Sequence, residues 1–202
     1  MLWLPLASIA QNVWERPDVE EEKQAQDEKK ESKEDPKYMV GAVPVINGEV
    51  CWKMDYDVPG KSAQELYDIM LRFLSQLVKE ENQLDGSCVS LVNKKEHKIA
   101  ASIREWLVFK NVFLALDRTK FFYTLIVDCK DNHVGVEMKR ISYRYEEERN
   151  EGGFHYKAEE WITDEMALNK KRTKIYKGPA KFRKKTIDRK DNLFEQIKAA
   201  LQ

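Results

Sequence analysis

The chain has 202 residues, which suits one domain with a tail, and its 35 basic and 35 acidic side chains give a formal net charge of zero. No stretch reaches the roughly 18 consecutive apolar residues that a membrane-spanning helix needs, so the sequence excludes such a helix. The three cysteines are far apart and include no C-x-x-C pair. This spacing argues against a zinc site and a thioredoxin-type redox pair, and favours free thiols.

The first ten residues are typical of the end of a secretory signal peptide. Leu2 to Leu6 form an apolar run, and Ser8-Ile9-Ala10 places small residues at the −3 and −1 positions of a cleavage site before Gln11. An ordinary buried N-terminal strand is the alternative. We therefore predict an exported protein of the periplasm or cell envelope, with residues 1–10 as a signal-peptide remnant.

Residues 11–36 form a charged segment. From Glu15 to Pro36 the chain carries ten acidic and five basic residues, and Val19 and Ala25 are almost its only apolar ones. Such a segment buries too little surface to offset its ordering entropy, which predicts a flexible linker; a solvated helix is the alternative. Residues 37–202 are then left as a single, mildly basic domain.

Order is expected from about Tyr38. Asn47-Gly48 joins the extended run Val43–Ile46 to Glu49–Trp52, which is a strong hairpin signal. Pro44 lacks a donor N–H and places the first arm at a sheet edge. From Val50 to Val58, apolar and polar residues alternate, as in a half-buried strand.

Ser62-Ala-Gln-Glu65 is a capping box and predicts that a helix begins there. We expect this helix to run over about 63–81 and to pack against Val50, Trp52, Phe121 or their strand partners. Its apolar residues recur at helical spacing, in a stripe made of Leu66, Ile69, Met70, Phe73, Leu74 and Leu77.

Further strands are predicted over 88–92, 98–106, 121–129 and 134–145. In the last of these the apolar residues change phase, so we expect either a β-bulge near Lys139-Arg140 or burial on different faces at its two ends. A helix from about Asp191 closes the chain. The element order is β-α-β-β-β-β-α, which indicates an α+β fold.

Motifs of known chemistry are missing from the sequence. It contains no P-loop, dinucleotide fingerprint, HExxH or GxSxG, and its three histidines are isolated from one another. His155 and Glu159 have the i, i+4 spacing of a metal site, but the preceding Gly152-Gly153 favours a loop. We assign no catalytic residue, cofactor or metal ligand.

Residues 169–190 carry the main charge feature, eleven cations opposed by Asp188 alone. Clustered cations favour binding to a polyanion, with Lys181, Arg183, Lys184 and Lys185 as candidate contacts. The alternative is a solvated face with Ile175, Tyr176, Phe182 and Ile187 packed inward. Export argues against nucleic acid as the partner.

A second candidate surface is aromatic. Its main members are Tyr143, Tyr145, Tyr156 and Trp161, joined by Phe154 and interleaved with Arg140 and Arg144. Such a set suits stacking on a sugar ring or a planar ligand. The alternative is that these rings pack across the sheet, as aromatic residues in strands commonly do.

Four segments carry a family resemblance. They are Tyr38–Pro44, Val58–Ser62, Trp161–Asn169 and Phe182–Asp188, and they resemble a group of exported bacterial proteins known as a domain of unknown function with a TATA-binding-protein-like fold. The resemblance covers about Tyr38 to Leu201. It implies a curved antiparallel sheet with helices packed on one face, and it supplies no catalytic or ligand residues.

The leading hypothesis is a non-catalytic binding module of the cell envelope. Its partner would be a protein, a glycan or an anionic lipid, bound through the uncovered sheet face or the basic segment. One alternative is a hydrolase with an acid/base pair beside Tyr143–Trp161. Another is binding of nucleic acid or a further polyanion through residues 170–190.

Overall fold

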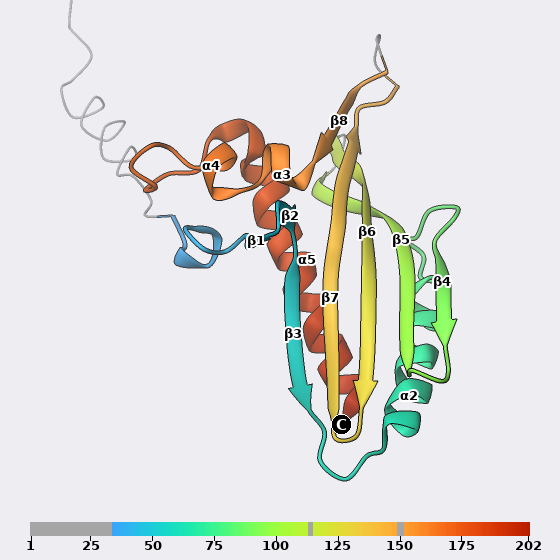
Figure 1. Ribbon diagram of the computed structural model, residues 1–202. Coiled ribbons are helices and arrows are strands. Elements are labelled where there is room, and N and C mark those ends of the chain that lie inside the picture. Colours follow the sequence, from blue (N-terminus) through green and yellow to red (C-terminus); the bar gives the residue numbers. More distant parts are fainter. Residues whose placement is uncertain (1–33, 113–114, 149–151) are drawn as a thin grey trace, which may run out of the picture. The chain divides into compact units, whose positions relative to one another are not determined.

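Antiparallel strands form the centre of the structure, a computed structural model that describes residues 34–112, 115–148 and 152–202 (Figure 1). The predicted signal-peptide remnant, and the predicted linker as far as residue 33, lie outside these residues. The described chain begins at Glu34 and enters a short 3-10 helix, Pro36–Tyr38, whose N-cap is Asp35. No helix among the described residues is long and apolar enough to cross a membrane.

Six strands make the main sheet, and every pairing in it is antiparallel. Their order is β3-β7-β6-β5-β4, and β8 pairs with the far end of β7. The sheet consists of β3 (Trp52–Asp57), β4 (Cys88–Asn93), β5 (Lys98–Val112), β6 (Ala115–Lys130), β7 (His133–Tyr145) and β8 (Phe154–Lys157). The α+β prediction is confirmed.

The predicted hairpin is present, but it stands as a separate two-stranded sheet. Its strands are β1 (Val45–Ile46) and β2 (Glu49–Val50). The backbone φ angles of Asn47 and Gly48 are 53° and 81°, as a two-residue turn with both central residues in the left-handed region requires.

A β-bulge resolves the phase change in β7. The register passes from Phe122↔Ser142 to Thr124↔Lys139, so one residue of β6 faces two residues of β7. Arg140 is one of the two, and its φ of 57° allows the extra residue to fit. Because of the bulge, Ile141 is buried on the same face as Met138.

The helix α2 (Ala63–Leu77) begins at the predicted capping box. Ser62 N–H donates to Glu65 Oε2 at 2.8 Å, and Glu65 N–H donates to Ser62 Oγ at 3.3 Å. The helix ends four residues before the predicted position.

The predicted stripe of α2 was wrong in part. Ile69 and Phe73 are only half-buried at its flank, whereas Tyr67 is fully buried. The face that meets β5, β6 and β7 is made of Leu66, Tyr67, Met70, Leu74 and Leu77.

The last helix, α5 (Lys177–Leu201), begins well before the predicted Asp191. Pro179 is its third residue, where the missing N–H breaks no helical hydrogen bond. The short helices α3 (Ala158–Trp161) and α4 (Asp164–Ala167) precede it. Both α2 and α5 lie on one face of the sheet (Figure 1). Residues 177–190 of the basic segment belong to α5, which buries Phe182, Arg183, Thr186 and Ile187.

Neighbouring residues of α2 test this packing. Leu74→Ala removes a fully buried side chain, so we expect it to lower the free energy of unfolding by about 2–5 kcal/mol. Phe73→Ala should lower it by less, since the Phe73 ring is half-exposed. Urea denaturation of both variants checks the order, and a larger loss for Phe73→Ala would contradict the assigned face.

Candidate functional site

The predicted aromatic surface is mostly core. Tyr143 is 1% exposed, and its hydroxyl lies 2.8 Å from Thr186 Oγ1 of α5. Burial raises the pKa of Tyr143 well above its ordinary value. The prediction that Tyr143 stacks on a ligand was therefore wrong, because the bulge in β7 directs its side chain into the core.

The other aromatic candidates surround one core ring. Tyr156 and Trp161 stack with their ring centroids 4.2 Å apart, and both meet Phe182 edge to face. Tyr145 also meets Phe182 edge to face. These half-buried rings pack across the sheet and onto α5, which is the alternative that the sequence left open.

Arg183 is fully buried and is not available to a polyanion, so this assignment was wrong. Its guanidinium donates to the carbonyl oxygens of Tyr38, Met39 and Ile162, and to Asp164 Oδ1, at 2.6–2.7 Å. A buried guanidinium needs this many acceptors. Arg183 therefore joins the start of the domain to the α3–α4 region.

The three lysine candidates differ in their surroundings. Lys181 Nζ donates to Asp117 Oδ2 at 2.9 Å and to the Tyr145 hydroxyl at 2.7 Å. Lys184 pairs with Glu34 at 2.6 Å. Lys185 is partly exposed. The helical phase of α5 thus commits most of these cations to intramolecular contacts.

Carboxylates beside the Tyr143–Trp161 segment also have local partners. Glu159 Oε1 accepts a 2.6 Å hydrogen bond from the backbone N–H of Val50, and thereby holds β2 beside α3. Glu160 Oε2 accepts one from Lys157 N–H at 3.4 Å. Both carboxylates are therefore engaged in structural hydrogen bonds.

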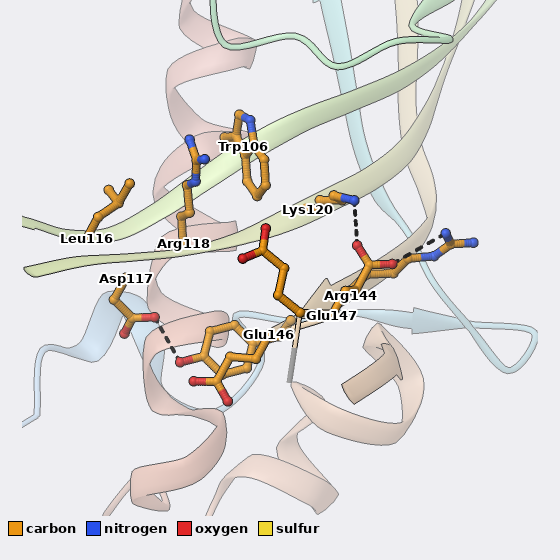
Figure 2. A pocket seen from close by; sticks show the side chains of 10 residues that line it. Trp106, Leu116, Asp117, Arg118, Lys120, Arg144, Glu146 and Glu147 are labelled. Atoms are coloured by element: carbon orange, nitrogen blue, oxygen red, sulfur yellow. Dashed lines mark hydrogen bonds and ion pairs between the residues drawn. The ribbon is translucent and has the colours of Figure 1, made fainter. Parts of the chain in front are cut away.

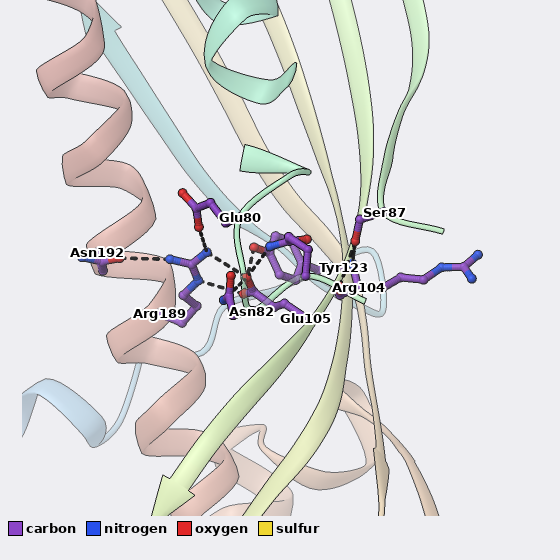
Figure 3. Close-up of polar contacts among 9 residues, drawn as sticks. Glu80, Asn82, Ser87, Arg104, Glu105, Tyr123, Arg189 and Asn192 are labelled. Carbon is purple, nitrogen blue, oxygen red and sulfur yellow. Dashed lines mark hydrogen bonds and ion pairs between the residues drawn. The ribbon is translucent and has the colours of Figure 1, made fainter. Parts of the chain in front are cut away.

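Sequence reasoning missed a buried polar cluster around Glu105, which is 1% exposed (Figure 3). Arg189 holds this carboxylate with two hydrogen bonds of 2.8 Å. Tyr123, Asn82 and Gln83 also donate to it, at 2.9–3.1 Å. Burial and the adjacent carboxylate raise the pKa of Tyr123 well above its ordinary value. Glu105 is buried and both of its carboxylate oxygens accept hydrogen bonds, so we interpret the cluster as structural.

On the face of the sheet that no described helix covers, here called the uncovered face, cationic and aromatic side chains lie in cross-strand rows. Trp106, Lys120 and Arg144 are direct neighbours on β5, β6 and β7. Arg104 and Phe122 belong to the next row. Trp106 alternates with the buried Glu105 and Leu107, and that alternation was the sequence signal for its outward position.

A groove of about 340 Å³ lies at the C-terminal end of β7, where the chain leaves the sheet. Its lining consists of Trp106, Leu116, Asp117, Arg118, Lys120, Arg144, Tyr145, Glu146, Glu147 and Glu148. Figure 2 shows Arg118 beside Trp106, with the guanidinium carbon 3.7 Å from the ring centroid. Glu147 lies 2.6 Å from Lys120 Nζ and 3.6 Å from Arg144, and pairing with Lys120 lowers the pKa of Glu147.

The burial of Arg183 generates a prediction about stability. Arg183→Gln leaves Asp164 and the bonded carbonyls without their cation, so we expect a loss of about 3–5 kcal/mol. Lys185→Gln, two residues along the same helix, is the control and should change stability by less than about 0.5 kcal/mol. Thermal and urea unfolding measure both. An Arg183→Gln variant as stable as the wild type would contradict the structural role.

Comparison with known proteins places the chain. A family model described as a domain of unknown function (DUF4468) with TBP-like fold matches residues 52–144, from β3 to the end of β7. The crystal structure of a DUF4468 family protein from Bacteroides ovatus ATCC 8483 is similar with a TM-score of 0.77 and 38% identity, covering 84% of this chain and 95% of that one. A TBP-like protein from Parabacteroides distasonis ATCC 8503 has a TM-score of 0.64 and 25% identity, covering 79% and 97%. No curated protein matches. The fold and the shared sequence together confirm the resemblance, and the chain belongs to the DUF4468 family of TBP-like domains.

Proposed function

We propose that the domain is a non-catalytic binding module of the cell envelope, and that it binds a glycan in the groove beside Trp106. The observation that carries this proposal is the placement of Trp106 on the uncovered sheet face, in a groove lined by both cations and carboxylates. At about 340 Å³, the groove lies in the lower part of the roughly 300–1,000 Å³ range of small-ligand sites.

The mixture of charges favours hydroxyl groups over a polyanion. Asp117 and Glu146–Glu148 offer acceptors, whereas Arg118, Lys120 and Arg144 offer donors. A sugar hydroxyl donates and accepts at once, so it suits both kinds of wall. A phosphate or sulfate polymer would meet four carboxylates in this groove, and repulsion from them would oppose its binding.

The groove is also preorganised. Trp106, Lys120 and Arg144 stand on three hydrogen-bonded strands, and Glu147 holds Lys120 and Arg144 together. At its far end, the Tyr145 hydroxyl donates to Asp117 at 2.9 Å, and Lys181 donates to both. A ligand therefore finds polar groups that are already oriented, which reduces the ordering entropy of binding.

The location in the envelope rests on the leader-like residues 1–10 and stays a prediction. A glycan ligand agrees with that location, because the cell envelope displays polysaccharide. Detection of the native protein in periplasmic or envelope fractions would support it.

The binding test uses a panel of soluble cello-, malto-, xylo- and chito-oligosaccharides, with heparin added as a polyanion. Isothermal titration calorimetry should detect binding of at least one neutral oligosaccharide. Trp106→Ala should weaken that binding by about 30-fold, since truncating a central aromatic contact removes roughly 2 kcal/mol.

Arg104→Gln is the matched control, because Arg104 lies one row away on the same face and outside the lining of the groove. It should bind as the wild type does, whereas Arg118→Gln should bind more weakly. Equal affinities for Trp106→Ala and the wild type would contradict the proposed site. Binding to heparin alone would contradict the assignment of a neutral glycan.

A further inference from the structure

The basic segment 169–190 divides into two parts that the sequence does not separate. From Lys181 onward its cations lie on α5, where Arg183, Lys184 and Arg189 have carboxylate partners. Residues 169–177, here called the cationic loop, lie before and at the start of that helix. The loop contains Lys170, Lys171, Arg172, Lys174 and Lys177, all exposed, and no acidic residue.

Hydrogen bonds give the cationic loop a defined conformation. Asn169 Oδ1 accepts from the backbone N–H of Thr173 at 2.8 Å, and Asn169 O accepts from Arg172 N–H at 2.7 Å. Arg172 occupies the left-handed region with φ 54°. Leu168 and Ile175 then form an isolated antiparallel bridge. The side chains at the tip of the loop therefore project from an ordered turn.

A small core holds the base of the loop to the domain. Ala167, Leu168 and Ile175 are buried together, with Tyr38 and Met39 packed against them. The Arg183 guanidinium adds hydrogen bonds to Asp164 of α4 and to the Met39 carbonyl. The loop is thus fixed to the same residues that begin the domain.

Two large apolar side chains flank these cations in sequence and stand in solvent. Met166 is 50% exposed and Tyr176 is 49% exposed. Within residues 165–177, Glu165 is the one acidic residue against five cations. Protein segments that bind the surface of an anionic membrane typically combine exposed apolar residues with neighbouring cations. Tyrosine is favoured in the headgroup region of such a membrane.

We infer that the cationic loop docks the domain on an anionic lipid surface, with Met166 and Tyr176 entering the headgroup layer. Charge complementarity supports this occupant, since clustered Lys and Arg are attracted to anionic headgroups. The exposed apolar pair distinguishes a bilayer from a nucleic acid or a sulfated glycan, because those polymers gain most of their affinity from charge alone. This inference is independent of the glycan groove, whose lining shares no residue with the loop.

The test is co-sedimentation of the full chain with vesicles of phosphatidylcholine, with and without about one third phosphatidylglycerol. We expect binding to the anionic vesicles only, and weaker binding as the salt rises from about 0.1 M to about 0.5 M. The triple variant K171Q/R172Q/K177Q should bind at least roughly tenfold more weakly. The triple variant K94Q/K95Q/K98Q, which changes the turn before β5 and the first residue of that strand, is the matched control and should bind as the wild type does.

A second variant tests the apolar contribution. M166S/Y176S keeps every cation, so its affinity for anionic vesicles at low salt should be close to that of the wild type. At high salt its affinity should fall several-fold, because insertion of the two side chains into the headgroup layer then contributes most of the binding. Circular dichroism melting checks that each variant is folded. Unchanged vesicle binding by the K171Q/R172Q/K177Q variant would overturn the proposal. The proposal would also be overturned if the protein bound duplex DNA or heparin tightly but did not bind vesicles, and if M166S/Y176S kept that tight binding.

Discussion

The bidentate ion pair between Arg189 and Glu105 determines how α5 lies on the sheet (Figure 3). Glu105 stands in the middle of β5 on the core face, where an ionised carboxylate without partners would be strongly unfavourable. Arg189 must therefore lie over β5. Since successive residues of a helix turn by a fixed angle, this one contact also sets the faces on which Phe182, Arg183 and Thr186 lie. We infer that the pair specifies the position of α5, a role better attested for buried ion pairs than large net stability.

Once α5 and α2 are fixed on the core face, no described helix lies over the opposite face of the sheet. Each strand must then alternate apolar and polar residues along its whole length. In β7 this is possible only because the bulge at Arg140 restores the phase before Tyr143. The same bulge places Arg144 in a row with Lys120 and Trp106. The packing of the core and the composition of the groove therefore have a common origin in the register of β6 and β7.

Local signals in the sequence predicted the local features. Asn47-Gly48 predicted the hairpin, and Ser62 and Glu65 predicted the start of α2. The apolar phase change predicted either a bulge near Lys139-Arg140 or burial on different faces, and the structure has the bulge. The start of α5 was not predicted, because its cations interrupt the apolar period that marks a helix. The cluster around Glu105 was also beyond reach, since Arg189 lies 84 residues away in sequence. A single glutamate in phase with the buried residues of β5 was nevertheless a usable sign that a distant cation would be needed.

The cations of the basic segment show why composition alone did not locate a binding surface. Arg183 is buried with its acceptors in place, Lys181 donates to Asp117 and Tyr145 of the groove, and Lys171 is exposed to solvent. The difference follows from geometry: on α5 every third or fourth residue returns to the sheet, whereas the turn at Asn169 directs consecutive residues outward. The Arg183 guanidinium enters the core and has its hydrogen-bonding capacity taken up there, whereas Lys171 remains accessible to a partner. Secondary structure therefore decides which cations of the basic segment stabilise the fold and which can bind a ligand. The division between the two groups lies at the first turn of α5.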